Sequence, residues 1–141
     1  MPSPADTFPS ATPAAAPGRD ILVIDDSVLI REAAKVALGT IGGWRVLTAA
    51  SGEEGLALAS SEQPDAILLD VVMPDMDGIA VAESLQARTS TRSLPVVLLT
   101  AQDRPEDQRR LQRLPVIGMI AKPFDVANLS SQLAALLGWT A

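Results

Sequence analysis

Four short apolar runs in this chain each end on a polar side chain suited to phosphate or metal chemistry. The runs are rich in aliphatic residues and cover 21–24, 66–69, 96–99 and 118–121. They are followed, in order, by Asp25 with Asp26, by Asp70, by Thr100 and by Lys122. In an open parallel sheet the carboxyl ends of the strands lie along one edge, where ligands bind. We therefore expect three carboxylates, one hydroxyl and one ammonium group to converge at one sheet edge.

The segments between these runs have helical spacing, so strands and helices alternate along the chain. The pattern predicts strands at 20–24, 44–49, 66–70, 96–100 and 117–121. It predicts helices at 27–38, 51–60, 79–87, 105–114 and 126–137. Strands that are apolar throughout indicate a sheet covered on both faces, and the alternation indicates βαβ units with right-handed crossovers. The expected fold class is α/β, a doubly wound, five-stranded parallel sheet with five helices.

Local signals place several helix ends. Ser51 followed by Glu54 fits a capping box, which begins the second helix. The glycines at 39, 42 and 43 end the first helix, and Gly138 ends the last one. Trp139 lies just beyond that end, where it either docks on the surface or makes no contact.

Composition excludes several classes of protein. A chain of 141 residues suggests one domain, and its 48% hydrophobic content can form a core that is mainly aliphatic, since aromatic residues make up 3%. A net charge of −6 argues against nucleic-acid binding through bulk charge. The absence of cysteine and histidine excludes disulfides, thiolate chemistry, histidine-based triads and histidine-ligated metals.

The first 18 residues differ from the rest, because they hold five of the 11 prolines among Ala, Ser and Thr. Such a segment cannot bury enough apolar surface to offset its ordering entropy, so we expect residues 1–18 to be a disordered tail and 19–139 to be the folded domain. No apolar run approaches the roughly 18 residues of a membrane span. The start of the chain lacks the pattern of a signal peptide. We expect a cytoplasmic protein without membrane insertion.

The predicted acid cluster needs a compensating positive charge. If the first and third strands are neighbours, Asp25 and Asp26 lie within several ångströms of Asp70. Two unit charges about 5 Å apart repel by roughly 3 kcal/mol at an effective dielectric constant of 20. Three such charges are tolerable with a bound cation or with shifted pKa values. Magnesium suits the site, because it prefers oxygen ligands and combines carboxylates with phosphate oxygens.

The remaining polar residues indicate what would bind beside that cation. Lys122 is a strong point-charge partner for phosphate, and the Thr100 hydroxyl can donate to a phosphoryl oxygen. A carboxylate can act as nucleophile toward phosphorus and form an aspartyl phosphate. Asp70 is the best candidate, because it stands alone on the middle strand between the acid pair and Lys122.

Four motifs together identify a family. The motifs Val-Ile-Asp25-Asp26-Ser, Leu-Leu-Asp70-Val-Val-Met-Pro-Asp-Met-Asp-Gly, Leu-Leu-Thr100-Ala and Ala-Lys122-Pro-Phe resemble the receiver domain of two-component response regulators. The intervals also fit, at 45 residues from Asp25 to Asp70, 30 to Thr100 and 22 to Lys122. Each motif alone is weak, but the four in this order are specific. The resemblance covers about residues 20–138 and implies the strand order 2-1-3-4-5.

The resemblance also implies a metal site and a phosphorylation site. Asp70 would be the phosphoacceptor. Asp26 and Asp70 would bind Mg²⁺ together with the backbone carbonyl of Val72, and Asp25 would act mainly through water. The turn residues Asp75 and Asp77 are expected to shape the loop before Gly78 rather than to bind metal.

The same resemblance implies a switch and its partners. Lys122 would pair with the phosphoryl group, Thr100 would swing inward to bond it, and the Lys122–Pro123 peptide would be cis. The phosphoryl group would come from a sensor histidine kinase or a histidine phosphotransfer protein. The face formed by residues 105–114, 117–121 and 126–137 would then control binding of a downstream protein target. We expect no direct nucleic-acid binding and a monomer or weak dimer.

Three departures from the family pattern matter. Met119 stands where the family has an aromatic residue that turns inward on activation, so that rotamer switch is absent. Pro115 and Val116 replace the usual Gly-Ala, which alters the corner before the last strand. Val72, like Gln102, would flank the path of attacking water, and valine cannot position water. We expect the phosphoryl group to last longer than in fast chemotaxis-type receivers, and its loss within seconds without a phosphatase would contradict this.

Other classes of protein compete with this interpretation. A pseudo-receiver that is never phosphorylated is a binding module, although such domains usually lose one of the site residues. A phosphatase with an aspartate nucleophile typically has a second acid two residues later, where this chain has Val72. A flavin carrier would need a phosphate-binding loop after the first strand, where Asp25 and Asp26 would repel phosphate. We expect a receiver that catalyses its own phosphorylation and slow dephosphorylation but is not a turnover enzyme.

Overall fold

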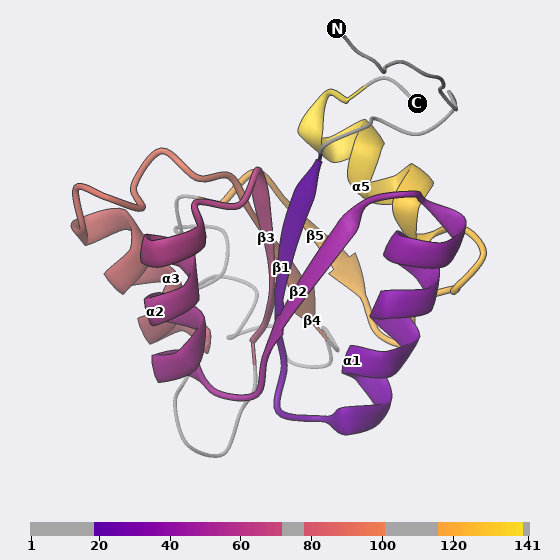
Figure 1. Ribbon diagram of the computed structural model, residues 1–141, viewed down its shortest axis with the longest axis horizontal. Coiled ribbons are helices and arrows are strands. Elements are labelled where there is room, and N and C mark those ends of the chain that lie inside the picture. The colour runs from indigo at the N-terminus through magenta and orange to yellow at the C-terminus, as the bar shows by residue number, and fades with distance from the viewer. Residues whose placement is uncertain (1–18, 72–77, 101–115, 140–141) are drawn as a thin grey trace, which may run out of the picture.

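The computed structural model describes residues 19–71, 78–100 and 116–139, and within them it forms a parallel sheet of five strands (Figure 1). The strand order is β2-β1-β3-β4-β5, as the resemblance implied. The strands are β1 (Asp20–Ile24), β2 (Arg45–Ala49), β3 (Ala66–Asp70), β4 (Val96–Thr100) and β5 (Gly118–Ala121). The predicted fold class is confirmed, and the bounds of β1, β3 and β4 are those expected from the apolar runs.

Helices cover both faces of the sheet (Figure 1). On one face lie α2 (Gly52–Glu62) and α3 (Gly78–Ala87), and on the other lie α1 (Val28–Ala34), its continuation η1 (Lys35–Ile41) and α5 (Leu129–Leu137). The helix predicted at 105–114 lies outside the described residues. Within the described ranges, no helix has the length and apolar character needed to cross a membrane.

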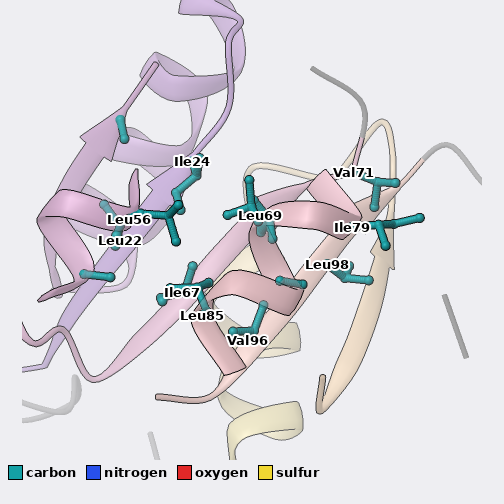
Figure 2. Close-up of a cluster of buried hydrophobic side chains, with 14 residues drawn as sticks. Leu22, Ile24, Leu56, Ile67, Leu69, Val71, Ile79, Leu85, Val96 and Leu98 are labelled. Carbon is teal, nitrogen blue, oxygen red and sulfur yellow. The ribbon is translucent and has the colours of Figure 1, made fainter. Parts of the chain in front are cut away.

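Each face of the sheet packs its own core, because successive side chains of a strand point to opposite faces. Figure 2 shows the cluster beneath α2 and α3, which includes Leu22, Ile24, Leu56, Ile67, Leu69, Leu85 and Leu98. The cluster beneath α1 and α5 includes Ile21, Val23, Leu38, Leu68, Val97, Leu99, Leu129 and Leu133. Burial on both faces explains why the strands are apolar throughout. The two cores fix the sheet whose edge carries the polar residues.

The first helix is longer than predicted and changes type. Its α-helical part ends at Ala34, and the chain continues as the π-helical segment η1, in which the N–H of Gly42 donates to the carbonyl of Ala37 at 3.1 Å. Gly42 allows a close approach there, because a Cβ atom would lie 2.7 Å from the Leu38 carbonyl oxygen and 2.9 Å from Cβ of Ser130. The segment therefore seats against α5.

The last helix begins later than predicted, at Leu129 rather than at residue 126. The side chain of Asp125 accepts hydrogen bonds from the backbone N–H of Ala127 and from the side-chain amide of Asn128. These bonds hold the chain in a turn, which competes with the helix. Gly138 ends the helix in the left-handed conformation, with φ of 74°, as expected for a C-terminal glycine.

Trp139 docks on the surface, which settles one of the two alternatives left open by the sequence. Its ring packs edge-to-face against Trp44, with 5.0 Å between ring centroids. The guanidinium of Arg19 lies 4.4 Å from the Trp139 ring centroid, within cation–π range. The cluster ties the start of β1 to the end of α5, at the amino end of the strands.

Gly55 provides a test of how tightly α2 packs on the sheet. A Cβ atom there would collide with Cδ1 of Ile24 and lie 2.8 Å from its Cγ1, and Ile24 is fully buried. We expect Gly55→Ala to lower the free energy of unfolding by about 1–3 kcal/mol through overpacking, measured by urea denaturation. Glycine-to-alanine changes in an open helix instead stabilise by about 0.5–1 kcal/mol.

The control is Ser61→Ala, at an exposed position of the same helix, which should change the stability by less than about 0.5 kcal/mol. A Gly55→Ala protein as stable as the wild type would show that the contact with Ile24 is not tight.

Candidate functional site

The parallel sheet brings the four polar strand ends to one edge. β1 pairs with β3 as far as Ile24 opposite Leu69, so Asp25 and Asp70 follow on neighbouring strands. On the other side of β3, β4 ends at Thr100, which stands opposite Ala121 of β5. Lys122 follows directly, and its backbone N–H donates to the Thr100 carbonyl at 2.9 Å.

The three acids form a compact cluster. One carboxylate oxygen from each of Asp25, Asp26 and Asp70 lies within 4.8 Å of the other two. Asp25 is 1% exposed and Asp70 3% exposed, whereas Asp26 is exposed at the rim. Hard divalent cations prefer oxygen ligands and keep part of their water, so a cluster with one open side suits such an ion.

Lys122 supplies positive charge inside the cluster. Its Nζ donates to Oδ1 of Asp70 at 2.9 Å and lies 3.5 Å from Oδ2 of Asp25. Burial lowers the pKa of Lys122, but the hydrogen bond from the ammonium to Asp70 and the charges of Asp70 and Asp25 outweigh burial and leave this pKa above its ordinary value. Lys122 is therefore a stable ammonium group at neutral pH.

Asp25 is a buried acid with charges of both signs around it. Burial raises its pKa, and the charges of Asp70 and Asp26 raise it further, while the hydrogen bond from Ser27 and the charge of Lys122 oppose the rise. The net pKa is raised. Oδ2 of Asp25 is buried and accepts no hydrogen bond from the described residues. A buried oxygen without a donor is the atom that a bound cation, or its water, would satisfy.

Local contacts fix the acid pair where β1 gives way to α1. The N–H of Ser27 donates to Oδ1 of Asp25 at 2.9 Å, and Oγ of Ser27 accepts the N–H of Ile30 at 3.3 Å, which caps α1. Nη1 of Arg31 donates to the backbone carbonyl of Asp25 at 2.8 Å. Neither Ser27 nor Arg31 is among the site residues that the sequence predicts. The preference of serine for helix N-caps could have indicated Ser27, but no local pattern indicates the contact of Arg31.

Gly78 places the start of α3 against the end of β3, next to the phosphoacceptor candidate Asp70. Its N–H donates to the Val71 carbonyl at 2.8 Å. A Cβ atom at this position would collide with the carbonyl oxygen of Asp70 and lie 2.6 Å from Cα of Val71. Only glycine allows α3 to begin this close to the end of β3.

The remaining predicted residues divide into described and undescribed positions. Thr100 is 6% exposed at the end of β4, the Lys122–Pro123 peptide is cis as the resemblance suggested, and Met119 packs, half-buried, against the core cluster beneath α2 and α3. The positions that lie outside the described residues are Val72, Asp75, Asp77, Gln102 and Pro115.

The raised pKa of Asp25 predicts that replacing this residue with a neutral one stabilises the folded protein, by an amount that depends on pH. Because the folded state disfavours the ionised form, the ionised Asp25 costs stability above its folded pKa, and this cost vanishes as the pH falls toward the ordinary value of 3.8. Without Mg²⁺, we expect Asp25→Asn to be more stable than the wild type at pH 7, with a gain that shrinks as the pH falls toward 3.8, since the lost attraction to Lys122 offsets only part of the relief. Urea denaturation in EDTA at several pH values measures this.

Glu83→Gln, at an exposed position of α3, is the matched control and should show no comparable pH-dependent gain. An Asp25→Asn protein that is less stable than the wild type at pH 7 would contradict the prediction.

Known proteins share this fold. A family model described as the response regulator receiver domain matches residues 21–134. The probable transcriptional regulatory protein TcrX of Mycobacterium tuberculosis is 39% identical over 119 residues, which are 83% of this chain and 49% of that protein. The chain thus spans about half the length of the curated relatives that it matches.

Two solved structures are similar to this chain over nearly their whole length. Chemotaxis protein CheY4 of Vibrio cholerae has a TM-score of 0.77 and 30% identity, covering 84% of this chain and 98% of that one. The receiver domain of a sensor histidine kinase from Pseudomonas aeruginosa, with a magnesium ion coordinated in its active-site cleft, has a TM-score of 0.76 and 28% identity, covering 86% and 98%. Since the family model matches most of its length, the chain belongs to the response regulator receiver domain family of two-component signalling.

Proposed function

We propose that Asp70 accepts a phosphoryl group from a phosphohistidine of a sensor kinase or phosphotransfer protein. The observation that carries the proposal is the ion pair of 2.9 Å between Asp70 and Lys122, set beside the acid cluster. A carboxylate and an ammonium at contact distance provide a nucleophile and a phosphate-binding cation in one place.

The transfer is a single displacement at phosphorus. A carboxylate oxygen of Asp70 forms the new O–P bond as the P–N bond breaks, and the electron pair of that bond stays on the departing imidazole. Lys122, which already lies at contact distance from Asp70, would hold an equatorial phosphoryl oxygen. Phosphoryl transfer depends on positioning and charge stabilisation, which is the part that a rigid sheet edge supplies.

The residues present fit a magnesium ion. The cluster offers three carboxylates and the buried Oδ2 of Asp25, which lacks a hydrogen-bond donor among the described residues. We propose that Asp26 and Asp70 hold the ion directly, with the Val72 carbonyl, and that Asp25 acts mainly through water. Magnesium bound there neutralises the negative charge that a phosphoryl group adds to the acids.

The switch follows from the new charge. Phosphorylation adds about one negative charge and new acceptor oxygens beside Thr100 and Lys122. One hydrogen bond to a charged group contributes roughly 1.5–3 kcal/mol, whereas a swing from 1:99 to 99:1 requires about 5.5 kcal/mol. Thr100 alone is insufficient, so we propose that Thr100, Lys122 and backbone movement act together to change the binding of a protein target.

Two alternatives remain as outcomes of the test. A pseudo-receiver would keep the fold without accepting phosphate, and a phosphatase would turn over small esters. We favour the receiver because the described residues retain the full set of Asp25, Asp26, Asp70, Thr100 and Lys122. On this proposal the protein phosphorylates itself and loses the group slowly, and it is not a turnover enzyme.

The first turn of α1 supplies an apolar rim for the phosphodonor protein. Val28 is 61% exposed and Leu29 is 80% exposed, two and three residues after Asp26. Apolar side chains that are exposed next to one another mark contact surfaces for other proteins more often than singly exposed ones do. We propose that the donor protein covers this rim while it presents its phosphohistidine to Asp70.

The central test is phosphorylation by a small phosphodonor. With Mg²⁺ and acetyl phosphate, we expect the intact mass of the wild type to increase by one phosphoryl group. Asp70→Asn should not gain this mass, because it lacks the nucleophile. The control Asp65→Asn removes an exposed acid at the opposite end of the sheet and should react like the wild type.

An unchanged wild-type mass would favour the pseudo-receiver. Continuous phosphate release from many small esters would favour the phosphatase.

The apolar rim is tested by separating protein-mediated transfer from small-molecule transfer. We expect Leu29→Glu to slow transfer from a phosphorylated histidine phosphotransfer protein at least tenfold, a loss of about 1.4 kcal/mol or more in binding. Its reaction with acetyl phosphate should stay within about twofold of the wild type, since no site residue changes. Both rates can be followed by intact-mass spectrometry.

Val36→Glu is the matched control, because Val36 is 47% exposed two turns further along the same helical segment. Equal slowing by both variants would argue against a specific rim.

A further inference from the structure

We propose that Arg31 is a positioning residue for the cation site, holding the peptide between Asp25 and Asp26 so that both carboxylates face one ion. This rests on the proposed function in that the ion serves phosphoryl transfer. The inference comes from a hydrogen bond of 2.8 Å between Nη1 of Arg31 and the carbonyl oxygen of Asp25. Arg31 itself contacts no proposed ligand atom and acts through the backbone.

The bond lies where sheet pairing stops. The N–H of Asp25 still donates to the Ala49 carbonyl of β2 at 3.0 Å, but Ile24 is the last residue of β1 that is paired with β3. The Asp25 carbonyl lies just beyond the residues of β1 that pair with β3, and the guanidinium of Arg31 donates to it. A strand end without such a partner would leave this peptide free to rotate.

Arg31 is itself held in place, so the contact acts as a clamp. Its backbone N–H donates to the Ser27 carbonyl at 3.0 Å in the first turn of α1, and its side chain is half-buried. The helix begins at the cap formed by Ser27, whose N–H binds Oδ1 of Asp25. Serine thus orients the carboxylate of Asp25, and arginine orients the carbonyl of the same residue.

Among the three acids, Asp26 depends most on this backbone contact for its position. It is exposed, and its side chain makes no hydrogen bond or ion pair within the described part of the chain, yet one of its oxygens belongs to the cluster of three. Its position is therefore set by its backbone rather than by side-chain partners. The peptide that Arg31 holds is the one that leads into Asp26.

The charge of Arg31 and its proposed positioning role predict opposite effects on Mg²⁺ affinity when the side chain is removed, which makes the proposal testable. A guanidinium close to a cation site repels the cation, so removing it should tighten Mg²⁺ binding if charge alone matters. If Arg31 orients the ligands, removing it should weaken binding, as loss of groups that orient metal ligands typically weakens affinity by 10–100-fold.

The experiment is Mg²⁺ titration by isothermal calorimetry on the wild type and on Arg31→Met, Arg31→Lys and Arg45→Met. Methionine keeps the aliphatic stem without the donor, and we expect the dissociation constant for Mg²⁺ to rise at least about tenfold. Lysine keeps the charge and a donor, and should recover most of this loss. Arg45 pairs with Asp20 and Glu62 at the opposite end of the sheet, so Arg45→Met controls for net charge and should stay near the wild-type value.

A second readout separates the clamp from general destabilisation. With acetyl phosphate, Arg31→Met should need about tenfold more Mg²⁺ for half-maximal phosphorylation, whereas its rate at saturating Mg²⁺ should stay within about threefold of the wild type. Circular dichroism and thermal unfolding confirm that each variant is folded.

The proposal is overturned if folded Arg31→Met binds Mg²⁺ as tightly as the wild type or more tightly, if Arg45→Met shows the same weakening, or if the wild type binds no Mg²⁺. A wild type that binds Mg²⁺ but never gains a phosphoryl group would reject the proposed function, while the weakening in Arg31→Met would still support the clamp.

Discussion

The contact between Lys122 and Asp70 is the interaction on which the site depends. Three carboxylates gathered within 4.8 Å repel one another strongly, and two of them are almost completely buried. A single ammonium group at 2.9 Å from one acid and 3.5 Å from another offsets part of that repulsion. The remaining imbalance is visible in the raised pKa of Asp25 and in its oxygen without a donor. The acid cluster of the folded protein therefore still favours the binding of a further positive charge.

The sheet makes this crowding possible because its order is fixed by two apolar cores rather than by the polar residues. Each strand buries side chains on both faces, so a shift in register would misplace buried aliphatic groups on two sides. Because the register is fixed, the polar residues at the strand ends also have fixed positions. Closer to the acids, Ser27, Arg31 and Gly78 refine the positions through hydrogen bonds and close backbone packing.

The sequence predicted those parts that depend on local composition and on strand order. The bounds of β3 and β4 follow from continuous apolar runs, and the meeting of Asp25, Asp70 and Lys122 follows from parallel pairing. The late start of α5 depends on a turn around Asp125, which competes with helix formation over only three residues. The contact of Arg31 with the Asp25 carbonyl depends on a rotamer of a long side chain, which periodicity does not encode.

The contact between Trp139 and Trp44 gives the domain an intrinsic optical probe. These are the two tryptophans of the chain, and they touch one another at the end of the sheet away from the acids. Because Trp139 follows α5 and Trp44 precedes β2, a displacement of that helix that alters the ring contact would change the emission of the pair. The fluorescence of the unlabelled protein would thus report whether phosphorylation at the acid cluster changes the structure at the opposite end of the sheet.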